Sequence, residues 1–162
     1  MDNELLEIYN ELEKITLKKI NQGHKMSRNN FPTHRKECLG YVRQRFSGII
    51  DLSRFTKNHP ELCKLIFDYG KKICPFQFNS VELIKNLVCP PHKDKSNIGD
   101  SCIISFGNYE GCELVIEGNI TSAKYKPILF NGYEKEHWNT PLISGTKYSL
   151  IFYNTKGINN YL

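Results

Sequence analysis

Residues 81–106 read VELIKNLVCPPHKDKSNIGDSCIISF, and this stretch shows the pattern on which the fold depends. It begins and ends with runs rich in β-branched and other apolar residues, and the segment between them is polar. Short apolar runs without helical spacing predict β-strands. The Pro90-Pro91 pair ends the first strand, because proline has no amide hydrogen to give to a strand ladder. We therefore expect His92 at a strand end or in the loop that follows.

The same texture continues toward the end of the chain. Turn-forming pairs such as Gly107-Asn108 and Asn131-Gly132 separate short runs of strand-forming residues, and no helical pattern lies between them. Strands at this spacing favour a sandwich or a barrel-like jelly roll. The predicted strands are 81–88, 101–106, 112–117, 126–130, 135–138 and 146–153.

Helices are predicted only before residue 80. Apolar residues recur at helical spacing over 3–21, and Pro60 suits the first turn of a second helix that ends near Gly70. Between these helices, the polar residues 24–37 predict a loop and 40–45 predict a short strand.

Helices that precede a set of strands indicate the α+β class, which is here mainly β. We expect the N-terminal helices to brace one sheet of the jelly roll. A length of 162 residues is enough for one domain with a sizeable core. We therefore predict a single domain over 1–162, in which 1–78 is mostly helical and loop support and 79–156 is the β core.

The composition is that of an ordinary globular protein, with 40% hydrophobic and 24% charged residues. No apolar run approaches membrane-spanning length, and the acidic start Met1-Asp2-Asn3-Glu4 does not resemble a secretory signal. None of the six cysteines forms a C-x-x-C pair. We expect free thiols, no membrane partner, and an intracellular location, cytoplasmic or nuclear, in a reducing compartment.

Positive charge is concentrated in one segment. The net charge is +5, and residues 14–45 hold nine lysines and arginines but a single acid, Glu37. Such a segment could face a polyanion. It could equally be a solvated surface, which is the commoner role of a run of charges.

The polar loop after the first core strand carries the clearest chemical motif. In His92-Lys93-Asp94, an imidazole and a carboxylate stand two residues apart, so both can reach one metal ion. His137, in a distant predicted strand, could supply a second imidazole. Two histidines and one carboxylate leave three positions of an octahedral ion open, an arrangement typical of non-haem Fe(II) oxygen chemistry. Alone, His137 could also be a hydrogen-bonded core histidine.

The last predicted strand contains a cation in an apolar setting. Alternation places Lys147, Ser149 and Ile151 on one face and the apolar Tyr148, Leu150 and Phe152 on the other. An inward-facing lysine is costly unless it is paired, and a bound dicarboxylate would supply the partner, with Ser149 as a second donor. Alternatively, Lys147 lies at an edge and extends to water.

In order and spacing, these residues resemble the 2-oxoglutarate and Fe(II)-dependent oxygenases. The motif of that superfamily is H-x-D, a distal His, and an Arg or Lys about ten residues further on; here the last step, from His137 to Lys147, is ten residues. The resemblance covers roughly residues 80–155. It implies a double-stranded β-helix fold, Fe(II) held by His92, Asp94 and His137, and 2-oxoglutarate whose far carboxylate pairs with Lys147 and Ser149. It also implies O2 as the oxidant.

Flanking residues are similar to relatives of the TET/JBP nucleobase oxygenases, and a prolyl-hydroxylase-like branch is the other expectation. The resemblance lies in residues 90–99 and 107–114. Two departures from the TET/JBP pattern stand out. Cys112 occupies the place of the second residue of a usual Gly-Gly pair, and Lys147 replaces the arginine that these proteins use, so the bidentate fork is lost.

Further residues are candidates for contacts in the site. Asn86 shares a predicted strand face with Ile84 and Val88 and could touch 2-oxoglutarate or the substrate. Three residues next to the predicted ligands could line the substrate entrance, namely Lys93, Asn97 and Trp138. Asn86 could also be an edge-strand residue, and Trp138 a core residue.

The resemblance predicts a dioxygenase, a hydroxylase that couples substrate oxidation to decarboxylation of 2-oxoglutarate to succinate and CO2. A nucleic acid or a protein could be the substrate partner, and the sequence does not indicate an oligomeric state. The alternatives are a cupin-like metal enzyme without 2-oxoglutarate and a non-enzymatic jelly-roll binding module. Lys147 with Ser149 disfavours the first, because cupin-like enzymes need no buried anchor for a dicarboxylate, and the complete ligand set disfavours the second.

Overall fold

The structure, a computed structural model, describes residues 1–17 and 35–162. Its helices are α1 (Asn3–Glu13), α2 (Arg54–Asn58) and α3 (Pro60–Ile73). Asp2 caps α1 by accepting a hydrogen bond from the Leu5 amide at 2.8 Å. Pro60 occupies the first turn of α3, as predicted.

The first helix is shorter than the predicted 3–21. It ends at Glu13, because the chain then turns so that Leu17 enters the core, and the β-branched pair Ile15-Thr16 disfavours further helical residues. Residues 18–21 of the prediction lie outside the described part of the chain, as does most of the predicted loop 24–37.

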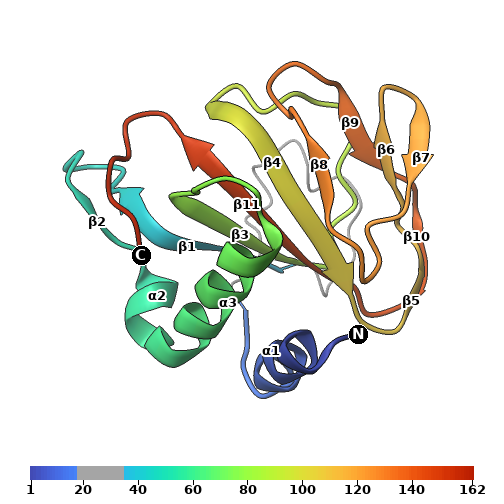
Figure 1. Ribbon diagram of the computed structural model, residues 1–162, viewed down its shortest axis with the longest axis horizontal. Helices are drawn as coiled ribbons and strands as arrows, with labels where there is room; N and C mark the ends of the chain where they lie inside the picture. Colours follow the sequence, from blue (N-terminus) through green and yellow to red (C-terminus); the bar gives the residue numbers. More distant parts are fainter. Residues whose placement is uncertain (18–34) are drawn as a thin grey trace.

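One sheet dominates the molecule (Figure 1). Its strands pair antiparallel in the order β2-β1-β3-β11-β4-β8. Two smaller sheets lie over one end of it, with orders β10-β5 and β7-β6-β9. The strands are β1 (Arg35–Arg43), β2 (Ile50–Leu52), β3 (Ser80–Lys85), β4 (Asn97–Phe106), β5 (Tyr109–Gly111), β6 (Leu114–Ile116), β7 (Asn119–Thr121), β8 (Ile128–Phe130), β9 (His137–Asn139), β10 (Leu142–Gly145) and β11 (Tyr148–Thr155).

Several predicted strand boundaries differ from the structure, and two of them bear on the site. β1 begins at Arg35, so 35–37 belong to a strand and not to the predicted loop; this strand pairs with β3 over Arg35–Gly40 and forms part of the main sheet. β3 ends at Lys85 and does not continue to residue 88, because Asn86 has a φ of 56°. A residue in that left-handed region cannot continue a strand.

Helices α1 and α3 cover one face of the main sheet (Figure 1). Their apolar side chains form the larger core together with alternate residues of β3, β4 and β11. Gly70 permits this close packing, because a Cβ built there would lie 2.4 Å from the Phe152 ring. The expectation that helices brace one sheet is therefore confirmed, and the opposite face of the sheet remains for a site.

Candidate metal centre

A pair of backbone hydrogen bonds brings the two candidate histidines together. The His92 amide donates to the His137 carbonyl at 3.1 Å, and the His137 amide donates to the His92 carbonyl at 3.0 Å. His92 lies in the loop after β3, as predicted, and His137 begins β9. Asp94 is fixed in the same way, since its amide donates to the Gly132 carbonyl at 2.8 Å. Three backbone contacts thus hold residues that are distant in sequence.

The three side chains converge. Asp94 Oδ1 lies 3.5 Å from His92 Nε2, and Asp94 Oδ2 lies 3.3 Å from His137 Nε2. The possible ligand atoms of all three residues lie within 4.8 Å of one another. Among the described residues this is the one cluster of three or more such side chains that could hold a metal ion.

The other ring nitrogen of each histidine is already occupied. His92 Nδ1 lies 2.7 Å from the Pro90 carbonyl oxygen, and His137 Nδ1 lies 2.9 Å from the Lys135 carbonyl oxygen. A carbonyl oxygen can only accept, so Nδ1 carries the hydrogen in both rings. Nε2 of each ring faces Asp94. A protonated ring donates from Nε2 to this carboxylate, whereas a neutral ring has its lone pair on Nε2 and can bind a metal ion there. Backbone carbonyls orient metal-binding histidines in this way in many proteins.

The charges in this cluster stabilise one another. Burial alone would raise the pKa of Asp94, but hydrogen bonds from His137 and His92, together with their positive charge, hold it well below its ordinary value. Burial would lower the pKa of His92, yet the hydrogen bonds to Asp94 and Pro90 and the Asp94 charge raise it above 6.5. Asp94 is therefore ionised and available as a ligand.

A glycine makes room for the Asp94 carboxylate. A Cβ built on Gly132 would lie 2.4 Å from Asp94 Oδ2 and 3.3 Å from His137 Cε1. Real Cβ atoms do not approach an oxygen so closely, so any side chain at this position would displace the carboxylate. The sequence showed Asn131-Gly132 as a turn signal only, and nothing in it indicated this second role.

The cluster opens into a cavity of about 550 Å³ on the face of the main sheet that the helices leave free. Lys147, which immediately precedes β11, lines it together with Ser149 and Ile151 of β11, while Tyr148, Leu150 and Phe152 enter the larger core. The predicted alternation of this strand is confirmed.

Lys147 is buried, with 5% of its surface exposed, so it does not extend to water. Its ammonium donates to the Cys112 carbonyl oxygen and lies 5.5 Å from the centre of the Tyr109 ring. No described carboxylate pairs with it. Ser149 shares a hydrogen bond of 2.9 Å with Ser105 next to it. A buried positive charge whose partner is a neutral carbonyl is an open position for an anion.

Asn86 has a different place from the one that the sequence predicted. It lies in the turn after β3, and it is not among the residues that line the cavity. Its Oδ1 accepts a hydrogen bond of 2.7 Å from the Lys147 amide. Asn86 therefore positions Lys147 at the entry to β11, and the predicted strand face that it shares with Ile84 and Val88 is wrong.

The other predicted site residues separate into two groups. Lys93 and Asn97 line the cavity, and Asn97 Nδ2 donates to Asp94 Oδ2 at 3.3 Å. Trp138 is half-buried in β9, paired with Val115, and is not part of the cavity wall.

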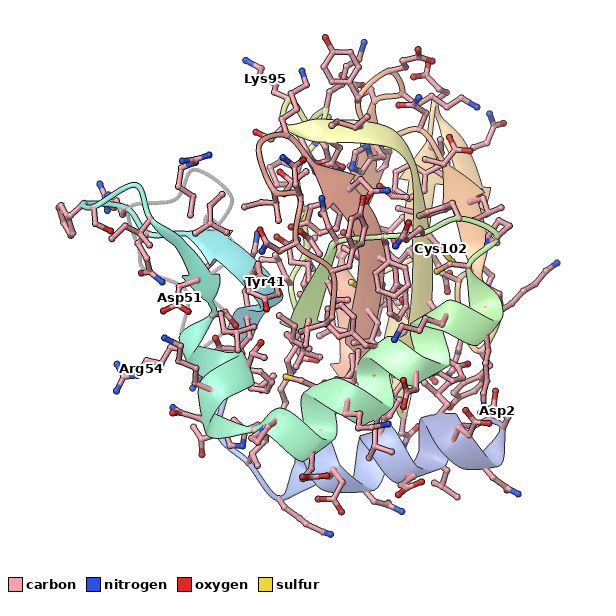
Figure 2. The ribbon with its side chains drawn as sticks, turned by 60° about the vertical axis from the view of Figure 1, so that its left-hand side comes forward. Asp2, Tyr41, Asp51, Arg54, Lys95 and Cys102 are labelled. Carbon is pink, nitrogen blue, oxygen red and sulfur yellow. The ribbon has the colours of Figure 1, made fainter. Side chains whose placement is uncertain are left out.

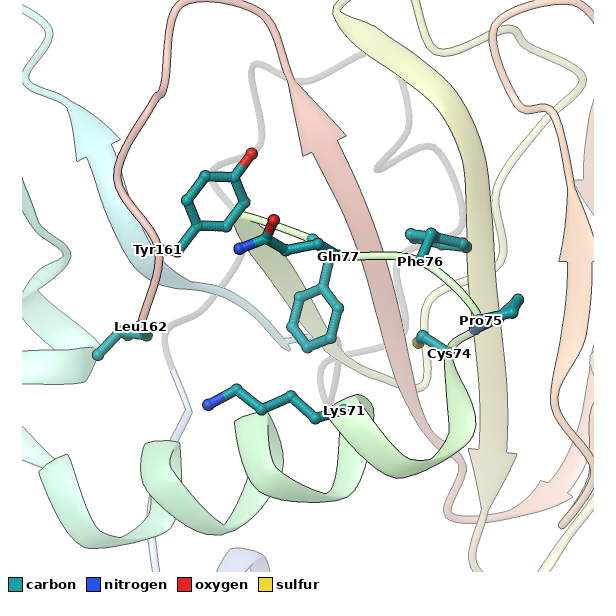
Figure 3. A pocket seen from close by; sticks show the side chains of 8 residues that line it. Lys71, Cys74, Pro75, Phe76, Gln77, Tyr161 and Leu162 are labelled. Atoms are coloured by element: carbon teal, nitrogen blue, oxygen red, sulfur yellow. The ribbon is translucent and has the colours of Figure 1, made fainter.

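A second hollow, of about 440 Å³, lies on the helical side of the sheet beside the end of α3 (Figure 3). Its walls include Lys71, Cys74 and Phe76, with Tyr161 and Leu162 from the end of the chain. It contains none of the three clustered side chains, so the chemistry of the chain is to be sought in the first cavity.

No family model matches the sequence, and no curated protein matches it. Solved structures do match. NgTET1 in complex with 5mC DNA aligns with 97% of this chain and 70% of its own, at 16% identity and a TM-score of 0.61. An oxidoreductase of the 2OG-Fe(II) oxygenase family from Burkholderia pseudomallei aligns over 92% of this chain and 77% of its own, at 12% identity and a TM-score of 0.54. A Pseudomonas putida prolyl-4-hydroxylase aligns over 94% of this chain and 84% of its own, at 10% identity and a TM-score of 0.51.

The chain has the fold of the 2-oxoglutarate and Fe(II) oxygenases. At these identities, the fold is what the chain shares with the three proteins. None of the described helices in this oxygenase fold is long and apolar enough to cross a membrane.

The cavity of this oxygenase fold has walls that the sequence did not reveal. Lys36 from β1 forms an ion pair of 2.5 Å with Glu82 from β3, and Tyr153 from β11 is beside them in the wall. β1 was predicted as a short strand over 40–45, so Lys36 had no place in a sheet. Its alternation is also weak, since most residues of β1 are only half-buried.

Proposed function

We propose that this chain is a 2-oxoglutarate and Fe(II)-dependent dioxygenase with a double-stranded β-helix core, a hydroxylase acting on a nucleobase or a protein side chain. One observation carries the proposal. A cluster of two histidines and an aspartate shares a single cavity with a buried ammonium that has no carboxylate partner. A metal enzyme without a dicarboxylate cosubstrate would not need Lys147 in its cavity. A lysine with a purely structural role would not need to share a cavity with the metal cluster.

The donor set fits Fe(II). His92 and His137 would each bind through Nε2, because their Nδ1 atoms are hydrogen-bonded to backbone carbonyls. Asp94 would complete the set as an ionised carboxylate. Two imidazoles and one carboxylate satisfy half of an octahedral ion and leave the rest for cosubstrate and oxygen.

The anchor fits 2-oxoglutarate. Lys147 would pair with the carboxylate that lies away from the metal, and Ser149 would donate a hydroxyl to the same group. The ammonium would then exchange a neutral carbonyl partner for a charged one, which would compensate a buried charge that now has no counter-ion among the described residues. Tyr109, whose ring lies beside the ammonium, would cover this end of the cavity.

Bound Fe(II) would supply the oxidation chemistry, in which 2-oxoglutarate decarboxylates to succinate and CO2 as the substrate is oxidised. The chain would orient the reactants and exclude water. Ile103, Ile151 and Phe130 give the cavity apolar walls, from which a bound substrate would displace water. Asn97, which donates a hydrogen bond to Asp94 Oδ2, would help to orient this ligand.

The nature of the substrate is the open part of the proposal. One structural neighbour was solved in complex with 5mC DNA, and another is a prolyl-4-hydroxylase. Proteins with this fold therefore include both a DNA-bound protein and a prolyl hydroxylase. The free state of all six cysteines fits the proposed intracellular, reducing compartment.

The first test is spectroscopic. Metal-free protein is mixed anaerobically with Fe(II) and 2-oxoglutarate, and the weak visible charge-transfer band of the chelate is recorded. We expect a band that Lys147→Ala weakens, that Lys147→Arg retains, and that the exposed control Lys64→Ala leaves unchanged. Succinate formation under air follows the same order.

Two other results would contradict the proposal. Metal binding without a band, in the presence of 2-oxoglutarate, would indicate a cupin-like enzyme. Absence of metal binding by folded protein would leave a jelly-roll binding module. His92→Ala and Asp94→Ala should each abolish both the band and turnover while the circular dichroism spectrum persists.

A further inference from the structure

The connection between β1 and β2 carries an aromatic side chain that packs against almost nothing. Phe46 is 98% exposed, and the neighbouring Ile49 is 64% exposed. Backbone hydrogen bonds close the turn, from Gln44 N to Ile49 O at 2.8 Å and from Gly48 N to Gln44 O at 2.9 Å. Phe46 is thus held outward by an ordered hairpin, which projects from the side of the molecule (Figure 1). Exposed apolar side chains gathered at one projection often mark an interaction site.

A cation accompanies this aromatic ring. The Arg45 guanidinium lies 5.8 Å from the centre of the Phe46 ring, and both side chains are exposed. Lys156 and the exposed Tyr133 form a similar pair beside the cavity, with 5.0 Å between the ammonium and the ring centre. In such a pair the cation can contact a phosphate while the aromatic ring stacks on the face of a base.

Hydrogen bonds connect the hairpin to the rim of the cavity. Arg43 donates to the Gly48 carbonyl at 2.9 Å and to the Gly157 carbonyl at 3.3 Å. The residue before Gly157, Lys156, donates its amide to the Ser96 carbonyl at 3.0 Å. Ser96 lies in the loop that carries Asp94 and lines the cavity. The hairpin is therefore fixed relative to the candidate metal centre.

The surface along this path is positive. Its exposed cations lie on three segments, and none of them is in an ion pair with a described acid, whereas Lys57, Lys64 and Lys72 elsewhere are all paired. The one acid within 43–48, 93–97 and 154–157 is Asp94, which belongs to the metal cluster. The cations are Arg43, Arg45, Lys93, Lys95 and Lys156. Figure 2 shows Lys95 at the top of the molecule and the β1–β2 hairpin at its left-hand side.

We propose that the β1–β2 hairpin and the cationic rim, defined as Arg43, Arg45, Phe46, Lys93, Lys95 and Lys156, bind a nucleic-acid strand and direct it to the cavity. Phe46 stacks on a base while Arg45 and the rim lysines contact phosphates. This inference rests on the proposed function in taking the cavity as the place of oxidation. An anionic membrane would need charge only around the exposed tip, but here the unpaired cations continue to the cavity mouth, as a strand entering it requires.

Binding is measured by fluorescence anisotropy with metal-free protein and short labelled oligonucleotides: single-stranded DNA, single-stranded RNA of the same sequence, and duplex DNA. Binding to any of the three, weakening as salt rises, supports the proposal, and the tightest of them identifies the form of the strand. We expect Phe46→Ala to weaken binding by roughly tenfold, the typical loss for one base–aromatic stack, and Phe46→Trp to restore it. Arg45→Gln should lower the slope of log affinity against log salt by about one.

The control is Ile143→Ala, a comparably exposed apolar side chain (74%) on β10. It should bind like the parent protein, and the melting temperatures of all variants should agree, because Phe46 contributes little packing. The proposal is overturned if no oligonucleotide binds at low salt, if Phe46→Ala binds as tightly as the parent, or if phosphatidylserine vesicles or a polyglutamate peptide bind instead with the same dependence on Phe46. No iron or 2-oxoglutarate is present in this assay, so a failure to bind nucleic acid does not contradict the oxygenase proposal. Likewise, a failure of the spectroscopic test does not contradict nucleic-acid binding by the hairpin.

Discussion

The Asp94 carboxylate occupies space that a side chain at position 132 would fill, since a Cβ built on Gly132 would lie 2.4 Å from its Oδ2. We expect Gly132→Ala to move the carboxylate and to weaken binding of Mn(II), a spectroscopic substitute for Fe(II), on the order of 10- to 100-fold. Mn(II) titration followed by electron paramagnetic resonance measures this. The control Gly118→Ala strains a turn with φ of +78° and open space around it, so it should lower stability and leave Mn(II) affinity intact. Equal Mn(II) affinity in both variants would exclude a steric role for Gly132.

Protonation of His92 should compete with metal binding. The pKa of His92 is raised above 6.5 by its hydrogen bonds and by the Asp94 charge, which outweigh burial. Mn(II) affinity should therefore begin to fall already at a pH above 6.5 and should continue to fall as acid is added, because a ligand imidazole must be neutral. Titrations across this range measure it.

The stability of the metal-free protein should follow a different course. The raised His92 pKa contributes stability at low pH that is lost as pH rises through the folded-state value, whereas the lowered Asp94 pKa contributes stability that is lost only in strong acid. Urea unfolding should thus show that the cluster stabilises the metal-free chain mainly at pH values between the folded-state pKa of Asp94 and that of His92. In Asp94→Asn both effects should disappear.

Single residues of the site were predictable where a short stretch of neighbouring sequence indicates their role. The spacing of His92 and Asp94 and the alternation around Lys147 follow from sequence and strand geometry. Gly132 was not predictable, because its importance depends on a carboxylate that arrives from a distant loop.

At the level of elements, the turn after β3 is the one on which the anchor depends, because it is hydrogen-bonded to the start of β11. Asn86 accepts the Lys147 amide at 2.7 Å and adopts a φ of 56°, which asparagine tolerates better than most residues. We expect Asn86→Ala to cost about 1–3 kcal/mol of unfolding free energy, since a buried N–H loses its partner. It should also weaken 2-oxoglutarate binding, because Lys147 lies at the affected strand end.

Two variants at the same position separate the causes. Asn86→Asp keeps the acceptor and should retain both properties, whereas Asn86→Gly relieves the backbone strain but loses the acceptor. Urea unfolding and the charge-transfer band measure the two effects. If Asn86→Gly matched the parent protein, the backbone conformation alone would be responsible and the hydrogen bond would not matter.

Elements with a strong periodic pattern were predicted well, and those whose ends depend on tertiary contacts were not. α3 has its proline start and its apolar face in the sequence. The end of α1 depends on Leu17 entering the core, and the start of β1 depends on its pairing with β3, so neither boundary has a local signal. Because the predicted strand began only at residue 40, Lys36 was absent from the predicted cavity wall.

For the whole molecule, the main sheet separates a packing face from a chemical face. β11 sends Leu150 and Phe152 to the helices and Ser149 and Ile151 to the cavity. A change that affects only the packing face should therefore alter stability without altering ligand binding, provided that the sheet itself keeps its register.

Gly70 allows that separation to be tested. An alanine Cβ at this position would meet the Phe152 ring at 2.4 Å and the Phe78 ring at 2.7 Å, so α3 or the rings must shift. Overpacking of this kind costs about 1–3 kcal/mol, and the better helix propensity of alanine offsets roughly 1 kcal/mol of it. We expect urea unfolding of Gly70→Ala to show a net loss of stability, while Mn(II) and 2-oxoglutarate affinities stay at the parent values. A parallel loss of ligand affinity would mean that strain crosses the sheet through Phe152 to its neighbour Ile151. The cavity would then depend on how the helices pack, and the two faces would have to be treated as one coupled unit.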